Sequence, residues 1–160
     1  MNAPFTLSLD AMGGDHAPDI VIKGVAEAHV RYPLARFLLF GDEKRIQPAL
    51  EANKTLAACC EVRHTDDVVT GDAKPSQVIR SGRNTSMWKA IEAVKAGEAG
   101  GVVSAGNTGA LMAMSKVIMR MLPGIDRPAI CSMFPSKIGE TVMLDLGANA
   151  QCDARNLVEF

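Results

Sequence analysis

Residues 101–112 constrain the fold of this chain more than any other part of the sequence. Gly101-Val102-Val103 is typical of the end of a short buried strand, because two β-branched residues follow a glycine. The next six residues, Ser-Ala-Gly-Asn-Thr-Gly, interrupt this run with two glycines and three small polar side chains. Beyond them, apolar residues recur at steps of three and four, as on one face of a helix: Ala110, Leu111, Met114, Val117, Ile118 and Met121. The stretch therefore predicts a strand, a tight glycine loop and a helix N-terminus, in that order.

This corner has the features of an anion-binding loop. Asn107 and Thr108 stand where a helix N-cap is expected. The N–H groups of a first helical turn lack partners within the helix and lie at the positive end of its dipole. Gly106 and Gly109 have no Cβ, so a phosphate or carboxylate can approach the backbone closely. The same residues also serve α/β proteins simply to turn the chain, and the spacing leaves both interpretations open.

Strands and helices are expected to alternate along the rest of the chain. Alternating patterns or short apolar runs predict strands at residues 5–9, 37–40, 60–64, 101–103, 129–134 and 141–146. Helical spacing predicts helices over residues 18–28, through 46–50, over 87–97, from 107 onward and from 153. The polar segment of residues 65–82 is interpreted as a long excursion with one helical turn, long enough to suggest a function. The pattern predicts an α/β fold with a mostly parallel sheet covered on both faces, built as a single domain over residues 1–160.

The composition argues against several classes of protein. A formal net charge of −1 and an aromatic share of 4% argue against a partner made of nucleic acid. The four cysteines show no C-x-x-C spacing, so we expect reduced thiols and no metal site. The sequence shows no signal-peptide pattern and no apolar run of membrane-spanning length, which makes the cytoplasm the expected location.

Three loops rich in glycine and polar residues follow predicted strands, at residues 10–15, 104–109 and 145–149. In a parallel sheet the carboxyl ends of the strands meet at one edge, where ligands bind. We therefore expect the three loops to form one site. None of them matches the dinucleotide fingerprint G-x-G-x-x-G or the P-loop G-x-x-x-x-G-K-[ST], so no nucleotide class is supported by a motif.

Four segments, taken together, resemble the phosphate acyltransferase (PlsX) family of bacterial phospholipid synthesis. They are Leu-Asp-Ala-Met-Gly-Gly-Asp from Leu9, the stretch from Arg80 to Met87, Ser-Ala-Gly-Asn-Thr-Gly-Ala-Leu-Met from Ser104, and Leu-Asp-Leu-Gly-Ala-Asn from Leu144. The first and third segments discriminate best. Family members continue well beyond this length, so the chain is expected to be the N-terminal part of a longer catalytic domain.

The resemblance implies a reaction in which acyl-acyl carrier protein and inorganic phosphate give acyl phosphate and free carrier protein. It further implies a three-layer α/β/α fold of the isopropylmalate-dehydrogenase-like kind, a homodimer and no cofactor. It also implies peripheral association with the inner face of the membrane, through a region that is absent from these residues.

The reaction needs phosphate held in line with a thioester carbonyl and donors aimed at the developing oxyanion. We assign phosphate binding to six residues: Ser104, Gly106, Thr108, Gly109, Arg83 and Asn149. The candidate catalytic residues are Asn107 as an oxyanion donor, His16 as a proton carrier and Asp10 as a group that orients a base or cation.

Each of these assignments has a simpler alternative. Arg83, or the neighbouring Arg80, could be a solvated loop charge, His16 a structural donor, and Asp10 a residue that only shapes its loop. For the whole chain, the alternatives are a phosphotransacetylase-like or dehydrogenase-like enzyme of the same fold, or an inactive fragment that binds phosphate or a partner. We expect the isolated chain not to complete the acyl transfer.

Overall fold

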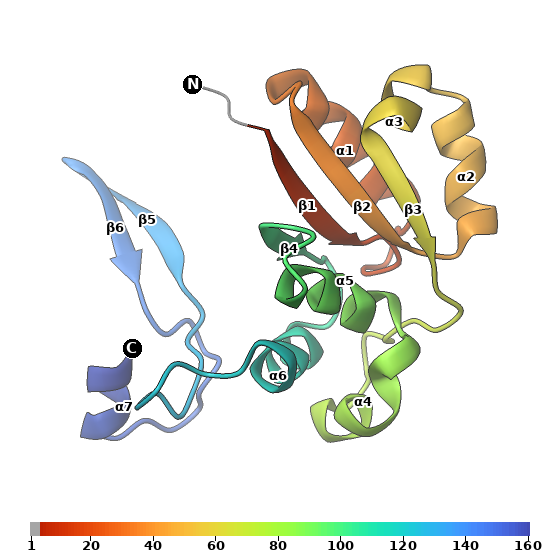
Figure 1. Ribbon diagram of the computed structural model, residues 1–160. Coiled ribbons are helices and arrows are strands. Elements are labelled where there is room, and N and C mark those ends of the chain that lie inside the picture. Colours follow the sequence, from red (N-terminus) through yellow and green to blue (C-terminus); the bar gives the residue numbers. More distant parts are fainter. Residues whose placement is uncertain (1–3) are drawn as a thin grey trace. The chain divides into compact units, whose positions relative to one another are not determined.

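The computed structural model describes residues 4–160. The chain divides into two compact units, Met1–Met119 and Arg120–Phe160, each of which is described by itself (Figure 1). The single domain predicted over residues 1–160 stays a prediction for the chain as a whole.

The first unit is organised around a parallel sheet of four strands, β1 (Phe5–Asp10), β2 (Ala35–Gly41), β3 (Cys60–His64) and β4 (Gly101–Val103). Their order in the sheet is β3-β2-β1-β4, and every neighbouring pair is parallel. Leu9 on β1 is in register with Leu39 on β2 and Val103 on β4. These pairings bring the ends of β1 and β4 side by side and confirm the predicted parallel sheet.

Helices cover both faces of this sheet, so the three-layer α/β/α architecture is confirmed (Figure 1). On one face lie α1 (Asp19–Arg31), α2 (Glu43–Glu51) and α3 (Lys54–Cys59). On the other face lies α5 (Ser86–Lys95), which also packs against α4 (Pro75–Ser81) and α6 (Thr108–Met119). A short 3-10 helix, η1 (Gly82–Asn84), joins α4 to α5.

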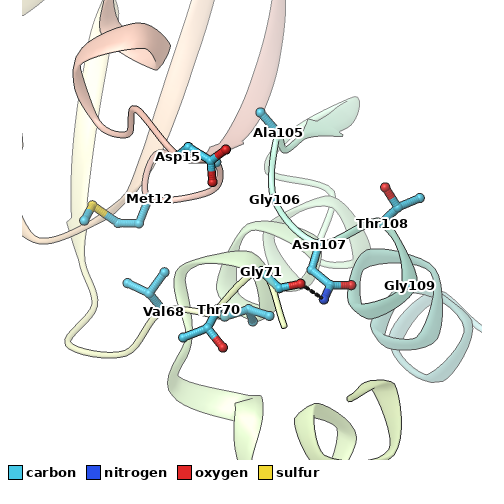
Figure 2. Close-up of a pocket in the computed structure, with 12 residues that line it drawn as sticks. Met12, Asp15, Val68, Thr70, Gly71, Ala105, Gly106, Asn107, Thr108 and Gly109 are labelled. Atoms are coloured by element: carbon cyan, nitrogen blue, oxygen red, sulfur yellow. Dashed lines mark hydrogen bonds between the residues drawn. The ribbon is translucent and has the colours of Figure 1, made fainter. Parts of the chain in front are cut away.

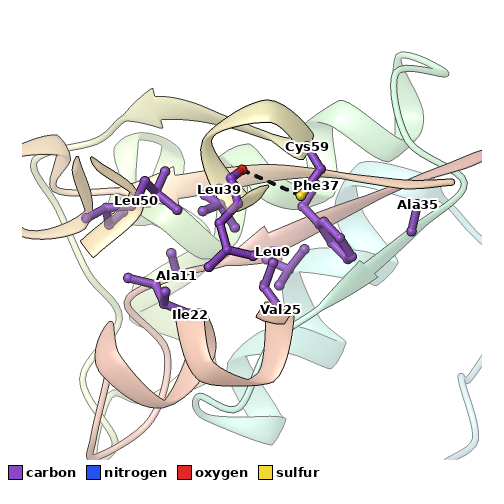
Figure 3. Packing of buried hydrophobic residues seen from close by; sticks show 11 residues of the cluster. Leu9, Ala11, Ile22, Val25, Ala35, Phe37, Leu39, Leu50 and Cys59 are labelled. Carbon is purple, nitrogen blue, oxygen red and sulfur yellow. Dashed lines mark hydrogen bonds between the residues drawn. The ribbon is translucent and has the colours of Figure 1, made fainter. Parts of the chain in front are cut away.

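The alternation of side chains along β2 explains why both faces are covered. Phe37 and Leu39 point into the cluster beneath α1, which Figure 3 shows, whereas Leu38 and Phe40 belong to the cluster against α5. Leu39 is fully buried, and burying a side chain of this size contributes about 1.5–3 kcal/mol. A strand that is apolar on both faces therefore requires a helix layer on each side.

The second unit contains an antiparallel hairpin, β5 (Ser132–Ser136) and β6 (Gly139–Met143), and the helix α7 (Ala154–Glu159). The strands predicted at 129–134 and 141–146 are thus displaced, and they form a separate two-stranded sheet. The reason is Pro135, interpreted as part of a loop but paired with Glu140. Each strand of a hairpin is an edge strand, where a proline is tolerated.

Two further features differ from the sequence prediction: an additional helix and the end of α6. The chain forms the extra helix α3, whose start is capped by the Asn53 side chain accepting from the N–H groups of Thr55 and Leu56. Helix α6 ends at Met119 rather than continuing through Met121, because Arg120 adopts a positive φ of 67°. Within residues 4–160, no helix combines the length and the apolar character needed to cross a membrane.

Candidate functional site

A pocket of about 570 Å³ lies in the first unit, where the loops after β1 and β4 approach the segment that follows β3 (Figure 2). Its three walls are formed by Met12, Gly14 and Asp15, by residues 68–71 and by residues 105–109. The first and third walls belong to two of the loops that the sequence singled out, and the second belongs to the polar excursion of residues 65–82. The polar excursion therefore helps to form the pocket.

Asn107 stands at the junction of two of these walls, and its side-chain amide is fully engaged. Its Oδ1 accepts from the backbone N–H of Ala110 at 2.9 Å, so it caps α6 as the sequence predicted. Its Nδ2 donates to the carbonyl of Gly71 at 2.9 Å (Figure 2) and to that of Ala73 at 3.1 Å. An oxyanion would compete with these two carbonyls for the same N–H groups, and the catalytic role of Asn107 stays a prediction.

The N-terminus of α6 supplies the backbone donors of the pocket. Thr108 and Gly109 both line it and form the first turn of this helix. The N–H groups of a first turn have no acceptor within their own helix, and they lie at the positive end of its dipole. Thr108 and Gly109 thus turn this first helical turn toward the pocket, and their binding of phosphate stays a prediction.

Ser104 and Gly106 interact with each other and with the loop below them. The Ser104 hydroxyl donates to Asp10 Oδ2 at 2.7 Å and accepts from the N–H of Gly106 at 3.1 Å. Gly106 lines the pocket, whereas Ser104 does not. Since the single hydroxyl proton points to Asp10, Ser104 shapes the loop in this structure, and its contact with phosphate stays a prediction.

Asp10 ends β1 and lies below the pocket with only 2% of its surface exposed. Its carboxylate accepts from the hydroxyl of Ser86 at 2.6 Å, from that of Ser104 at 2.7 Å and from the N–H of Met12 at 3.3 Å. Ser86 is not among the residues that the sequence predicted for the site. Its indications were its place in the segment from Arg80 to Met87, which carries the family resemblance, and its position directly before the apolar face of a predicted helix.

His16 and Arg83 do not line the pocket. His16 is exposed just before α1, where its carbonyl accepts from the N–H of Ile20 at 3.1 Å. Arg83 is exposed on η1, and Arg80 lies near the end of α4. The roles assigned to these three side chains stay predictions.

Asp15 is the one charged side chain among the residues that line the described pocket, which include no lysine or arginine. Its carboxylate is exposed. A negative charge at the rim opposes the entry of an anion, so backbone N–H groups must supply most of the attraction within these residues.

Asn149 lies in the second unit, in a loop braced by Asp145. It donates through its backbone N–H and its Nδ2 to Asp145 Oδ2, at 2.7 and 3.0 Å, and through Nδ2 to the carbonyl of Pro128 at 3.0 Å. This loop follows the hairpin strand β6, so the expectation that it ends a strand of the same sheet as the other two loops is wrong. Its place in a shared site with Asn107 stays a prediction.

Hydrogen bonds keep Asp145 ionised more readily than an ordinary aspartate. Desolvation acts to raise the pKa of Asp145, but hydrogen bonds from the N–H of Ile130 and from Asn149 and Ala148 outweigh it and lower the pKa. The N–H of Ile130 alone approaches Asp145 Oδ1 to 2.7 Å. The carboxylate is therefore matched to its donors in the ionised form.

The neighbouring thiols of Cys59 and Cys60 do not form a reactive pair. The Sγ atoms of the neighbouring Cys59 and Cys60 are 3.9 Å apart, and burial, together with the adjacent Cys59 thiol, raises the pKa of Cys60 to about 12. A thiol with so high a pKa is protonated and unreactive at neutral pH. No group of three or more His, Cys, Asp or Glu side chains in the described part of the chain could hold a metal ion.

An apolar groove of about 320 Å³ borders the same loop on its other side. It runs between α1 and the strands β1 and β4, and its end is formed by Val103, Ser104 and Ala105. Ala105 also lines the polar pocket. A polar cavity and an apolar groove therefore meet at one residue, a feature that was not predicted from the sequence.

A family model described as "Fatty acid synthesis protein" matches residues 5–160. Curated relatives named phosphate acyltransferase include those of Rhodospirillum rubrum, 62% identical over 160 residues, and Paramagnetospirillum magneticum, 60% identical over 160 residues. A third, from Rhodospirillum centenum, is 61% identical over 160 residues. The alignments cover 100% of this chain but only 45% or 46% of each relative. The chain thus spans about half the length of the curated relatives it matches.

Proposed function

The chain belongs to the fatty acid synthesis protein family, and from this membership we propose that it is the phosphate-binding N-terminal part of a phosphate acyltransferase. The proposed reaction moves a fatty acyl group from acyl-acyl carrier protein to inorganic phosphate. A phosphate oxygen attacks the thioester carbonyl, the C–S bond breaks, and acyl phosphate and the carrier thiol are released. The proton lost by phosphate balances the one taken up by the thiolate.

The observation that supports this proposal most is the polar pocket at the N-terminus of α6. Phosphate is a competent nucleophile near neutral pH, so the protein needs to hold it rather than to activate a serine or cysteine. We assign the holding of phosphate to the N–H groups of Thr108 and Gly109, with Gly106 allowing close approach. Arg83 and Asn149 are proposed as further phosphate contacts, and His16 as the proton carrier.

The apolar groove beside the pocket supports the acyl-transfer part of the proposal. An acyl donor presents a thioester and an aliphatic chain, and these need polar and apolar surfaces close together. The pocket and the groove share Ala105, so both surfaces occur at the same loop. We propose acyl carrier protein as the partner and, for the longer protein, a homodimer in the cytoplasm or at the inner face of the membrane.

The test uses a chimera in which these 160 residues replace the matching segment of the Rhodospirillum rubrum relative, which is 62% identical. We expect the chimera to form acyl phosphate from acyl-acyl carrier protein and phosphate, and the isolated chain to bind phosphate without turnover. Thr108→Pro removes one backbone donor at a helix position that tolerates proline. It should lower kcat/KM for phosphate by roughly a hundredfold, as the loss of an oxyanion-type donor does.

The matched control is Thr108→Ala, which keeps the backbone N–H and removes only the hydroxyl and methyl groups of the side chain. Activity equal to the parent in Thr108→Pro would contradict backbone phosphate binding at α6. Turnover of acetyl-coenzyme A or of a nicotinamide in place of the carrier-protein thioester would favour the phosphotransacetylase-like or the dehydrogenase-like alternative.

A further inference from the structure

The buried carboxylate at the end of β1 bonds to residues that are far apart in the sequence. Asp10 Oδ1 accepts from the hydroxyl of Ser86 at 2.6 Å, and its Oδ2 accepts from that of Ser104 at 2.7 Å. Its Oδ1 also accepts from the N–H of Met12 at 3.3 Å. We infer that Asp10 is a positioning residue that ties the three walls of the phosphate pocket together from below. Its effect on phosphate rests on the proposed function, whereas the anchoring itself is a property of the unliganded fold.

Each donor to Asp10 connects it to a different wall of the pocket. Met12 belongs to the first wall, with Gly14 and Asp15. Ser86 donates through its backbone N–H to the carbonyl of Asp67 at 3.0 Å, directly before the wall of residues 68–71. Ser104 accepts from the N–H of Gly106 at 3.1 Å, within the wall of residues 105–109. A single carboxylate therefore sets the position of all three walls.

Gly13 packs directly against Asp10 and Ser104, and neither Asp10 nor Gly13 lines the pocket. A Cβ atom on Gly13 would lie 2.4 Å from Asp10 Oδ2 and 2.8 Å from Ser104 Oγ, so a larger residue there would force these side chains to shift. A Cβ on Gly106 would lie 3.3 Å from the Gly13 Cα, which shows how closely the two loops pack. Since Asp10 is also only 2% exposed, it acts through Ser104 and Ser86 rather than by touching phosphate.

The direction of the hydrogen bonds depends on the carboxylate at this position. The Ser104 hydroxyl has one proton, which it gives to Asp10, and this leaves its lone pairs for the N–H of Gly106. The Ser86 hydroxyl is likewise a donor. An asparagine at residue 10 would have the same size but would turn an NH₂ group toward one of the two hydroxyls. The N–H groups above it would then lose their preset orientation.

The experiment measures phosphate affinity by calorimetry and amide exchange by NMR on the 160-residue chain. The variants are Asp10→Asn and Ser104→Ala, and the matched control is Ser8→Ala. Ser8 lies on the same strand, is fully buried and donates its hydroxyl to the carbonyl of Ala90 at 2.7 Å, away from the pocket. Ser8→Ala thus also loses a hydrogen bond donated by a serine hydroxyl, but one that does not contact the pocket walls.

We expect Ser104→Ala to weaken phosphate binding on the order of tenfold and to speed exchange at the N–H of Gly106 in the absence of phosphate. Asp10→Asn should speed exchange at both Gly106 and Ser86. Ser8→Ala should leave the phosphate Kd unchanged.

Equal phosphate affinities for Ser104→Ala and Ser8→Ala would overturn the inference, and so would unchanged exchange at Gly106 in Asp10→Asn. If the parent chain binds no phosphate, the proposed function fails, while exchange at Gly106 and Ser86 still decides the anchoring. If Asp10→Asn does not fold, the comparison of Ser104→Ala with Ser8→Ala decides it.

Discussion

Two aspartates, each followed by a glycine-containing loop, differ in how far away in the sequence their hydrogen-bond partners lie. Asp10 in the first unit accepts hydrogen bonds from side chains 76 and 94 residues away. Asp145 in the second unit accepts from residues only 4 and 15 positions away. Asp10 is therefore a tertiary anchor, and Asp145 is a local brace for its own loop. Similar short motifs after a strand do not imply the same structural role.

The surroundings of the two loops explain the difference. β1 lies inside a four-stranded sheet with helices on both faces, so the end of β1 is enclosed by other elements. β6 pairs only with β5, and apolar side chains of this hairpin such as Phe134 and Val142 are 44% and 54% exposed. A carboxylate at the end of β1 meets distant donors, whereas one after β6 finds its partners nearby.

The largest expected effect separates the anchor from the brace. Asp10→Ala leaves the buried hydroxyl of Ser86 and the partly buried hydroxyl of Ser104 without their acceptor, and should lower the free energy of unfolding by about 3–5 kcal/mol. Asp145→Ala should leave the unfolding of the first unit unchanged. Urea unfolding followed by the fluorescence of Trp88 measures this, because it is the only tryptophan in the sequence and is buried in the first unit.

If both variants lowered the midpoint of the Trp88 transition by similar amounts, the distinction between Asp10 and Asp145 would be contradicted. An intact transition in Asp10→Ala would show that the donors around residue 10 find other partners.

The second prediction contrasts two glycines that are needed for different reasons. Gly13→Ala places a Cβ 2.4 Å from Asp10 Oδ2, and overpacking of this kind costs about 1–3 kcal/mol. Gly147 has a φ of +80°, and a Cβ there would meet no atom within 4 Å. The cost of Gly147→Ala is therefore that of the left-handed backbone alone, about 1 kcal/mol.

Thermal unfolding measures both glycine variants, followed by Trp88 for Gly13→Ala and by hairpin amide signals for Gly147→Ala. A larger loss for Gly147→Ala would show that the second loop is the more tightly packed.

The sequence could predict the layers of the first unit because its strands are short apolar or alternating stretches between helices with clear spacing. It could also predict the loop at residues 104–109 as a candidate site, since glycines and an N-cap asparagine mark the start of α6. These are local patterns that depend on few neighbours.

The bond between Ser86 and Asp10 could not be predicted, because it joins residues 76 positions apart and depends on how α5 packs beneath β1. Nor could the engagement of the Asn107 amide by Gly71 and Ala73, which depends on the path of the polar excursion. The predicted hairpin strands are displaced because a proline such as Pro135 usually marks the end of a strand, although an edge position tolerates it. In each case the outcome depends on tertiary packing, which local sequence propensity does not determine.

The third prediction separates the two aspartates of the first loop itself. Asp15 lines the pocket and is exposed, whereas Asp10 is buried below it. Asp15→Asn removes a negative charge from the rim and should strengthen phosphate binding by about two- to fivefold at low salt, with the gain shrinking as salt rises. Calorimetric titration with phosphate measures this. The matched control is Glu140→Gln on the exposed hairpin, which makes the same change in net charge. Weaker binding in Asp15→Asn would mean that Asp15 assists the anion, for example through a bound cation.

The smallest expected effect is the pH dependence of the second loop. Desolvation acts to raise the pKa of Asp145, but the donors Ile130, Asn149 and Ala148 lower it overall, so its pKa in the folded chain lies below that in the unfolded chain. The carboxylate thus stabilises the loop fully above the unfolded pKa, and this stabilisation is lost as the pH falls through the lower, folded pKa.

Carbon NMR should place the titration of the Asp145 carboxyl below the ordinary value of about 3.9. Exchange at the N–H groups of Ile130 and Asn149 should speed up over the same acidic range. Asp145→Asn should abolish this acid dependence while leaving the Trp88 transition unchanged. A titration at or above the ordinary value would show that the brace is open in solution, and would remove the distinction between a buried anchor and a self-contained loop.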